Sequence, residues 1–150
     1  MRLELEWRER RVADLTRRYL KFVVDGESLS GERYHAWAVS VLGWGTSEAE
    51  ERAARRLLLE EPPDVGERVS LYVCALCGDI GCGATTVFVE PQDDEIVWRE
   101  AAWSTPALET ESVDRNSDRL AYRQWPDELR FDATEYRRLI EGRPRAAAQS

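Results

Sequence analysis

This sequence has few of the residues and segments that most readily identify a protein's chemistry. It contains one histidine and three cysteines, and only one of its 21 lysine and arginine residues is a lysine. No apolar run approaches the roughly 20 residues of a membrane-spanning helix. Charged residues interrupt residues 1–12, which therefore lack the apolar core of a signal peptide. The sequence predicts a cytoplasmic protein without a membrane partner.

Positive charge is also in deficit. The chain has 29 acidic residues against 21 basic ones, which gives a net charge of −8 and an isoelectric point near 4.8. Binding to nucleic acid draws its affinity from clustered cations, so this balance disfavours a nucleic-acid partner. A second protein, of basic character, is the partner that the charge favours.

The length and composition predict one folded unit. A chain of 150 residues with 43% hydrophobic residues is long enough to bury a core without disulfides. The pattern Gly142-Arg143-Pro144 is typical of a helix end and is followed by a polar, alanine-rich segment. We therefore predict a single domain over residues 1–142 and a flexible tail over 143–150.

Hydrophobic patterning in the first part of the chain predicts strands followed by one helix. Residues 3–8 alternate between apolar and charged, residues 17–24 are largely apolar, and Asp25-Gly26 is typical of a tight hairpin turn. A third strand is expected within residues 33–42. Ser47 and Glu50 form a capping-box pattern at the start of a helix over 47–60, which ends before Pro62.

The second half of the chain predicts a meander and a short final helix. Strands are expected over 68–74, 84–90 and 95–100, and residues 104–130 look irregular. Asp132 and Glu135 are typical of the start of a helix. The fold class is thus α+β: an antiparallel sheet with the main helix packed on one face and a short C-terminal helix.

All three cysteines lie in the segment CALCGDIGCG, between two predicted strands. Two cysteines three residues apart, followed by glycine, can grip one metal ion from a tight turn. Zinc usually takes four ligands. Cys74, Cys77 and Cys82 would supply three, and Asp79, the single histidine His35, a water or a second chain could supply the fourth.

The same segment has two other interpretations. Cys74 and Cys77 could form a redox dithiol, although such pairs usually sit at the start of a helix and the interleaved glycines disfavour one. Alternatively, the glycines permit a left-handed backbone in a long loop, and the cysteines are small apolar fillers beneath it. The residues alone leave zinc, redox and structural roles open.

Two tryptophans are candidates for contact with a partner protein. Trp44 lies between two glycines and Trp103 precedes the irregular stretch, and tryptophan is favoured at binding hot spots. Packing in the core is the competing interpretation for both. Carboxylates are scattered without a paired arrangement, so no catalytic residue is assigned.

One segment resembles a known family. It contains the motif Leu-Tyr-Val-Cys-x-x-Cys-Gly-Asp-x-Gly-Cys-Gly, carried here by Leu71, Tyr72, Val73, Cys74, Cys77, Gly78, Asp79, Gly81, Cys82 and Gly83. In this motif the chain resembles a family of small uncharacterised proteins from actinobacteria and similar high-GC bacteria. Some members of that family are labelled oxidoreductases, and the resemblance implies no mechanism for this chain.

Taken together, the sequence favours a non-enzymatic binding domain, of the kind in which an acidic immunity or antitoxin-like protein neutralises a basic partner. A small zinc-binding protein that uses the cysteine loop is the alternative. A thiol-based oxidoreductase is a second alternative.

Overall fold

The protein consists of two antiparallel sheets and two α-helices in a computed structural model, which describes residues 1–29, 38–78, 80–104 and 125–144. The elements are, in chain order, β1 (Leu3–Val12), β2 (Leu15–Val24), β3 (Glu27–Ser28), β4 (Ala38–Ser40), α1 (Ser47–Leu57), β5 (Val69–Cys74), the 3-10 helix η1 (Ile80–Cys82), β6 (Ala84–Gln92), β7 (Glu95–Ser104), β8 (Glu128–Asp132) and α3 (Ala133–Glu141). The predicted α+β class is confirmed.

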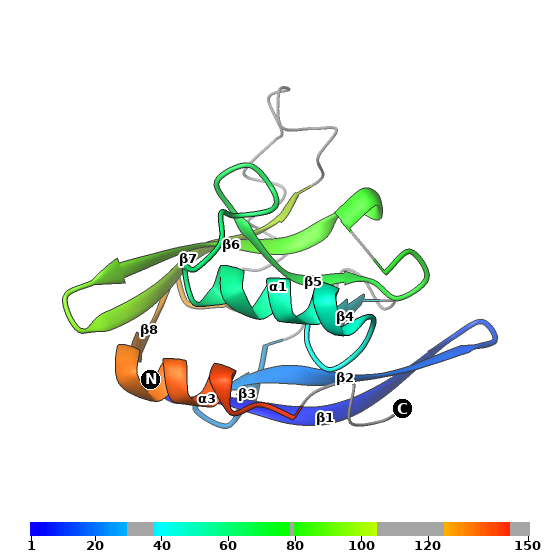
Figure 1. Ribbon diagram of the computed structural model, residues 1–150, viewed down its shortest axis with the longest axis horizontal. Helices are drawn as coiled ribbons and strands as arrows, with labels where there is room; N and C mark the ends of the chain where they lie inside the picture. The colour runs from blue at the N-terminus through cyan, green and yellow to red at the C-terminus, as the bar shows by residue number, and fades with distance from the viewer. Residues whose placement is uncertain (30–37, 79, 105–124, 145–150) are drawn as a thin grey trace.

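Both sheets keep their strands in chain order. The first has the order β1-β2-β3 and the second the order β4-β5-β6-β7-β8, with every pair antiparallel. Figure 1 shows the smaller sheet below the larger one, with α1 and α3 along one side of the space between them. The predicted meander is therefore the centre of a five-stranded sheet.

The two turns of the first sheet follow different local chemistry. Asp25 and Gly26 both have positive φ, 51° and 82°, as the predicted hairpin requires. The β1–β2 turn instead places Ala13 at φ 54°, without a glycine or asparagine. The sequence gives no signal for this turn. The predicted strands are therefore shorter than the observed β1 and β2.

Aromatic side chains join the two sheets. The Phe22 ring, on β2, lies edge-on to Tyr72 of β5 at 5.7 Å and to Trp98 of β7 at 5.4 Å between centroids. The Tyr72 hydroxyl accepts a hydrogen bond from the Phe22 amide and donates one to the Leu29 carbonyl. Because all three rings are almost fully buried, they fix how the sheets face each other.

A second set of buried groups attaches both helices to the larger sheet. Trp98 donates from Nε1 to the Tyr136 hydroxyl at 3.2 Å, and that hydroxyl donates to the Leu57 carbonyl at 2.6 Å. Burial raises the pKa of Tyr136 well above its ordinary value because ionisation would place a charge in the core. One hydroxyl therefore links β7, α3 and the end of α1.

The predicted cap of the main helix is wrong by one residue. Thr46, not Ser47, is the N-cap, and its side chain accepts from the Ala49 amide at 3.1 Å. The helix ends at Leu57, three residues short of the predicted limit. Because Ser47 is inside the helix, Glu50 does not complete a capping box with it, and its side chain is 2% exposed.

Glu50 instead forms a buried ion pair with Arg143. Arg143 donates from Nε and Nη2 to the two carboxylate oxygens at 2.7 and 2.8 Å, and from Nη1 to the Ile140 carbonyl. The pairing with Glu50 and Glu51 raises the pKa of Arg143 against the opposing effect of burial. Arg143, the first residue of the predicted tail, is therefore buried, whereas residues 145–150 lie outside the described part of the chain.

Two further predictions differ from the observed elements. Residues 104–130 were expected to be irregular, yet Glu128–Asp132 forms β8 and pairs with β7, while 105–124 lie outside the described residues. Of the strand expected within 33–42, the structure shows Ala38–Ser40, and 33–37 are not described.

The predicted cap of the final helix is confirmed. Asp132 caps α3 by accepting from the Glu135 amide at 2.9 Å.

None of the helices in the described ranges has the length and apolar character needed to cross a membrane.

The buried ion pair yields a stability prediction. Arg143→Met should lower the free energy of unfolding by about 3–5 kcal/mol, because it leaves the Glu50 carboxylate buried without its cation. Arg137→Met, which removes an exposed arginine of α3 paired with Glu141, should cost less than about 1 kcal/mol. Chemical denaturation followed by circular dichroism measures both, and equal effects would contradict the structural role of Arg143.

Candidate functional site

The cysteine segment is the connection between two neighbouring strands of the larger sheet. Cys74 is the last residue of β5, and β6 begins just after Cys82, at Ala84. The Gly78 amide donates to the Cys74 carbonyl at 2.8 Å, and the Gly83 amide donates to the Ile80 carbonyl at 2.9 Å. These two turns fold the connection back on itself and bring Cys82 toward Cys74 and Cys77.

The three sulfur atoms converge. The Sγ atoms of Cys74, Cys77 and Cys82 all lie within 4.8 Å of one another. Cys77 and Cys82 are joined by a disulfide, and Cys74 is a free thiol. Cys74 is half-buried, whereas the other two are exposed. The three sulfur atoms are therefore close together at the surface.

This arrangement suits a metal ion once the disulfide is reduced. Thiolates bind tetrahedral zinc at about 2.3 Å, which places two sulfur ligands about 3.8 Å apart. Sulfur atoms within 4.8 Å can reach that spacing with shifts below about 1 Å. The cluster thus offers three of the four ligands that zinc usually takes.

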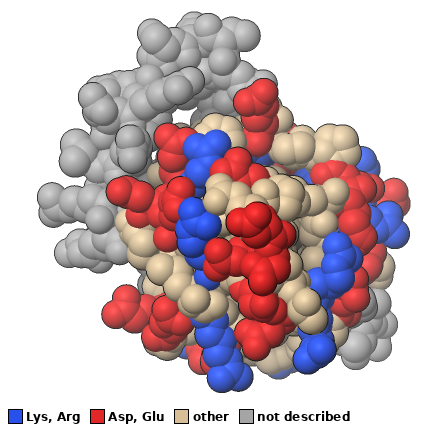
Figure 2. Space-filling model, turned by 90° about the vertical axis from the view of Figure 1, so that its left-hand side faces the viewer, with Lys and Arg blue, Asp and Glu red and all other residues tan. Residues whose placement is uncertain are grey.

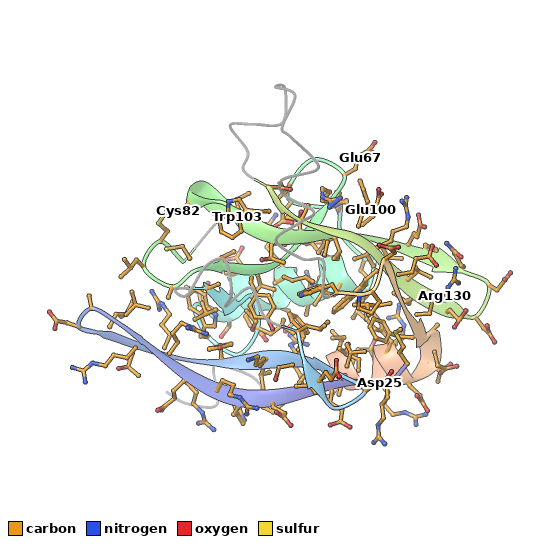
Figure 3. The ribbon with its side chains drawn as sticks, turned by 180° about the vertical axis from the view of Figure 1, so that it is seen from behind. Asp25, Glu67, Cys82, Glu100, Trp103 and Arg130 are labelled. Carbon is orange, nitrogen blue, oxygen red and sulfur yellow. A yellow bond between two sulfur atoms is a disulfide. The ribbon has the colours of Figure 1, made fainter. Side chains whose placement is uncertain are left out.

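Two tryptophans pack against glycines of the cysteine loop, one in its middle and one at its end. A Cβ at Gly78 would lie 3.2 Å from the Trp44 ring, and a Cβ at Gly83 would lie 2.5 Å from the Trp103 ring. Both glycines have positive φ, 72° and 101°. Figure 3 shows Trp103 beside Cys82. The middle of the loop and its end at β6 are therefore each packed against an indole at a glycine.

The indoles of Trp44 and Trp103 are half-buried. Trp44 also donates from Nε1 to the Ser40 carbonyl at 2.5 Å, which anchors its ring next to β4. Their predicted contact with a partner protein stays a prediction, while their contact with the loop is observed.

Sequence reasoning missed one charged residue at the site. Arg17 donates from Nε to the Ala75 carbonyl at 2.6 Å, and its guanidinium lies 4.3 Å from the centroid of the Trp44 ring. Its Nη2 would lie 3.9 Å from a Cβ at Gly78. Arg17 is 58 residues from Ala75, and no local pattern could have placed it there.

The fourth-ligand candidates are not placed. Asp79 and His35 both lie outside the described residues. Ala75 is fully buried and Leu76 is 45% exposed, so the segment between the first two cysteines has one anchored and one solvent-facing side chain.

Comparison of the chain with models of known protein families gave no match, and neither the curated proteins nor the solved structures gave one. The resemblance carried by Leu71–Gly83 therefore stays a prediction.

The contact between Gly83 and Trp103 can be tested by adding one methyl group. Gly83→Ala should lower the free energy of unfolding by about 2–4 kcal/mol, because the new Cβ meets the indole and a positive φ is unfavourable for alanine. Gly45→Ala is the matched control, since Gly45 has φ 82° but nothing within 4 Å of a Cβ. It should cost about 1–2 kcal/mol. Equal losses in denaturation experiments would show that Trp103 does not press on Gly83.

Proposed function

We propose that this protein is a small, non-enzymatic zinc-binding domain with Cys74, Cys77 and Cys82 as thiolate ligands. The observation that carries the proposal is the convergence of the three Sγ atoms to within 4.8 Å. Zinc readily takes cysteine thiolates, and the rings of Trp44 and Trp103 pack against the ligand loop at Gly78 and Gly83. In the proposed holo state the Cys77–Cys82 disulfide is reduced.

The charge beside the loop supports this proposal. Zinc with three thiolates has a net charge of −1, which an adjacent cation would stabilise. The Arg17 guanidinium reaches the loop at Ala75 and lies next to Gly78. Because guanidinium stays charged at every relevant pH, Arg17 offers that compensation permanently.

The oxidised pair supports a second use of the same residues. Cys77 and Cys82 form a disulfide with a third thiol, Cys74, in its immediate neighbourhood. A thiolate at Cys74 could attack the disulfide and release one of the two sulfurs as a thiolate, as in thiol–disulfide exchange. This is the thiol-oxidoreductase alternative, and metal binding and disulfide formation exclude each other at these residues.

Elemental analysis tests the zinc proposal. Protein purified with a reductant and without a chelator should contain about one equivalent of zinc, and Cys77→Ser should lose most of it because two thiolates hold zinc far more weakly than three. Leu76→Ala, which truncates the exposed side chain next to Cys77, is the matched control and should retain the metal.

A different outcome would favour the thiol alternative. Reduced protein without zinc, in which Cys77 and Cys82 form a disulfide reversibly in a glutathione buffer and Cys74→Ser slows the exchange, would replace the metal proposal. Thiol titration and mass spectrometry of alkylated protein measure the disulfide directly.

A binding domain for a basic partner is the second candidate, favoured by the charge of one end of the molecule. Figure 2 shows the end of the molecule at which the β6–β7 turn lies, and acidic side chains form a band on this face. Exposed acidic residues of this hairpin and of the β8–α3 segment are Asp93, Asp94, Glu128, Asp132 and Glu135. Such a surface would attract a basic protein, as an immunity or antitoxin-like function requires.

A cationic probe tests this second candidate. An oligolysine peptide should bind the full-length protein, and Asp93→Asn with Asp94→Asn should weaken binding severalfold because these carboxylates are at the tip of the hairpin. Glu4→Gln with Glu27→Gln, which removes the same charge from the other sheet, should have little effect. Fluorescence anisotropy measures the affinities, and equal losses would leave the β6–β7 end without a special role.

A further inference from the structure

The β1–β2 hairpin is a basic feature on an acidic protein. Residues 8–18 contain five arginines, one glutamate and one aspartate, so this segment has a net charge of +3 within a chain of −8. We call the five arginines the basic hairpin: Arg8, Arg10, Arg11, Arg17 and Arg18. The remainder of the chain therefore has a net charge of −11.

The register of the hairpin places one pair of like charges against each other, whereas Glu9 lies opposite Arg18 and Arg8 forms an ion pair with Glu6 at 2.6 Å. Arg10 is directly opposite Arg17 in the β1–β2 pairing. Like charges opposite each other on neighbouring strands destabilise a sheet. Arg8 lies two residues before Arg10 and therefore projects from the same face of β1. A bound anion would weaken the repulsion between Arg10 and Arg17.

Two of the arginines are held in place by aromatic rings. The Arg17 guanidinium lies 4.3 Å from the Trp44 ring centroid, and the Arg18 guanidinium lies 4.1 Å from that of Trp7. Stacking fixes the plane of a guanidinium while its edges can still donate to carboxylates. Because these side chains are ordered beforehand, binding an anion would cost less conformational entropy.

The hairpin is also accessible. Arg8, Arg11 and Arg18 are exposed, and Figure 1 shows the β1–β2 turn extending at the end of the molecule opposite the β6–β7 turn. The basic hairpin and the acidic residues of the β6–β7 end are therefore at opposite ends, and the hairpin's positive field is weakened little by those carboxylates.

We infer that the basic hairpin is a docking surface for an acidic segment of a partner protein. Stacked guanidinium groups are suited to bidentate recognition of Asp and Glu carboxylates. A long polyanion such as nucleic acid would extend past the hairpin onto a body with a net charge of −11, whereas a short acidic segment would not. Arg17 also contacts the cysteine loop, but the proposal is tested at Arg11 and Arg18 and does not depend on metal binding.

Binding of a defined acidic probe tests this inference. A fluorescein-labelled decaglutamate peptide should bind the full-length protein, with affinity that falls steeply as salt rises. Arg11→Glu with Arg18→Glu should weaken binding at least tenfold. Arg52→Glu with Arg138→Glu changes the net charge equally at two exposed arginines of α1 and α3 and should weaken it less than threefold. Circular dichroism and the melting temperature confirm that each variant is folded.

Four results would overturn the inference. The first is the absence of peptide binding at low salt, and the second is an equal loss of binding in both double variants. The third is tighter binding of a single-stranded oligonucleotide of the same charge, which would indicate a nucleic-acid surface. The fourth is self-association that Arg11→Glu with Arg18→Glu abolishes in sedimentation, without peptide binding, which would make the protein's own acidic end the occupant.

Discussion

The packing of Phe22 against Tyr72 and Trp98 is the contact on which the rest of the structure depends. It joins the two sheets through three almost fully buried rings, each with a large apolar area removed from water. Tyr72 lies two residues before Cys74, so the same contact fixes where β5 ends and where the cysteine loop begins. A strand that slipped by one residue would turn its side chains to the opposite face and separate the thiols from Trp44 and Trp103.

The loop inherits its order from this framework and from its glycines. Gly78 and Gly83 adopt positive φ and lie against the rings of Trp44 and Trp103, while Arg17 bonds to Ala75 at the start of the loop. Contacts that hold a loop in place reduce the conformational entropy that is lost when a ligand orders the loop. The sulfur atoms converge in the loop that the Cys77–Cys82 disulfide closes, and both proposed chemistries of the loop follow from this convergence.

Features encoded by neighbouring residues were predictable, and those made by distant residues were not. Asp25-Gly26 and the Asp132 cap need only local backbone preferences, and the alternation in 69–74 and 84–90 indicates strands directly. The clustering of cysteines in sequence likewise predicted their meeting in space. The burial of Glu50 depends on Arg143, 93 residues away, and the position of Arg17 depends on packing between the sheets, so neither helix nor strand periodicity could reveal these contacts.

The basic and acidic residues of the chain are concentrated in different parts of the fold. Arg17 lies where the basic hairpin meets the cysteine loop. It belongs to the basic hairpin by register, opposite Arg10, and to the cysteine loop by its bond to Ala75. Three thiolates concentrated on one loop repel each other unless cations compensate them, while two opposed arginines repel each other unless anions do. The bond from Arg17 to the Ala75 carbonyl places its guanidinium beside the loop, where it would offset part of the thiolate charge in the proposed zinc-bound state. The net charge of −8 conceals this arrangement, which only the fold makes visible.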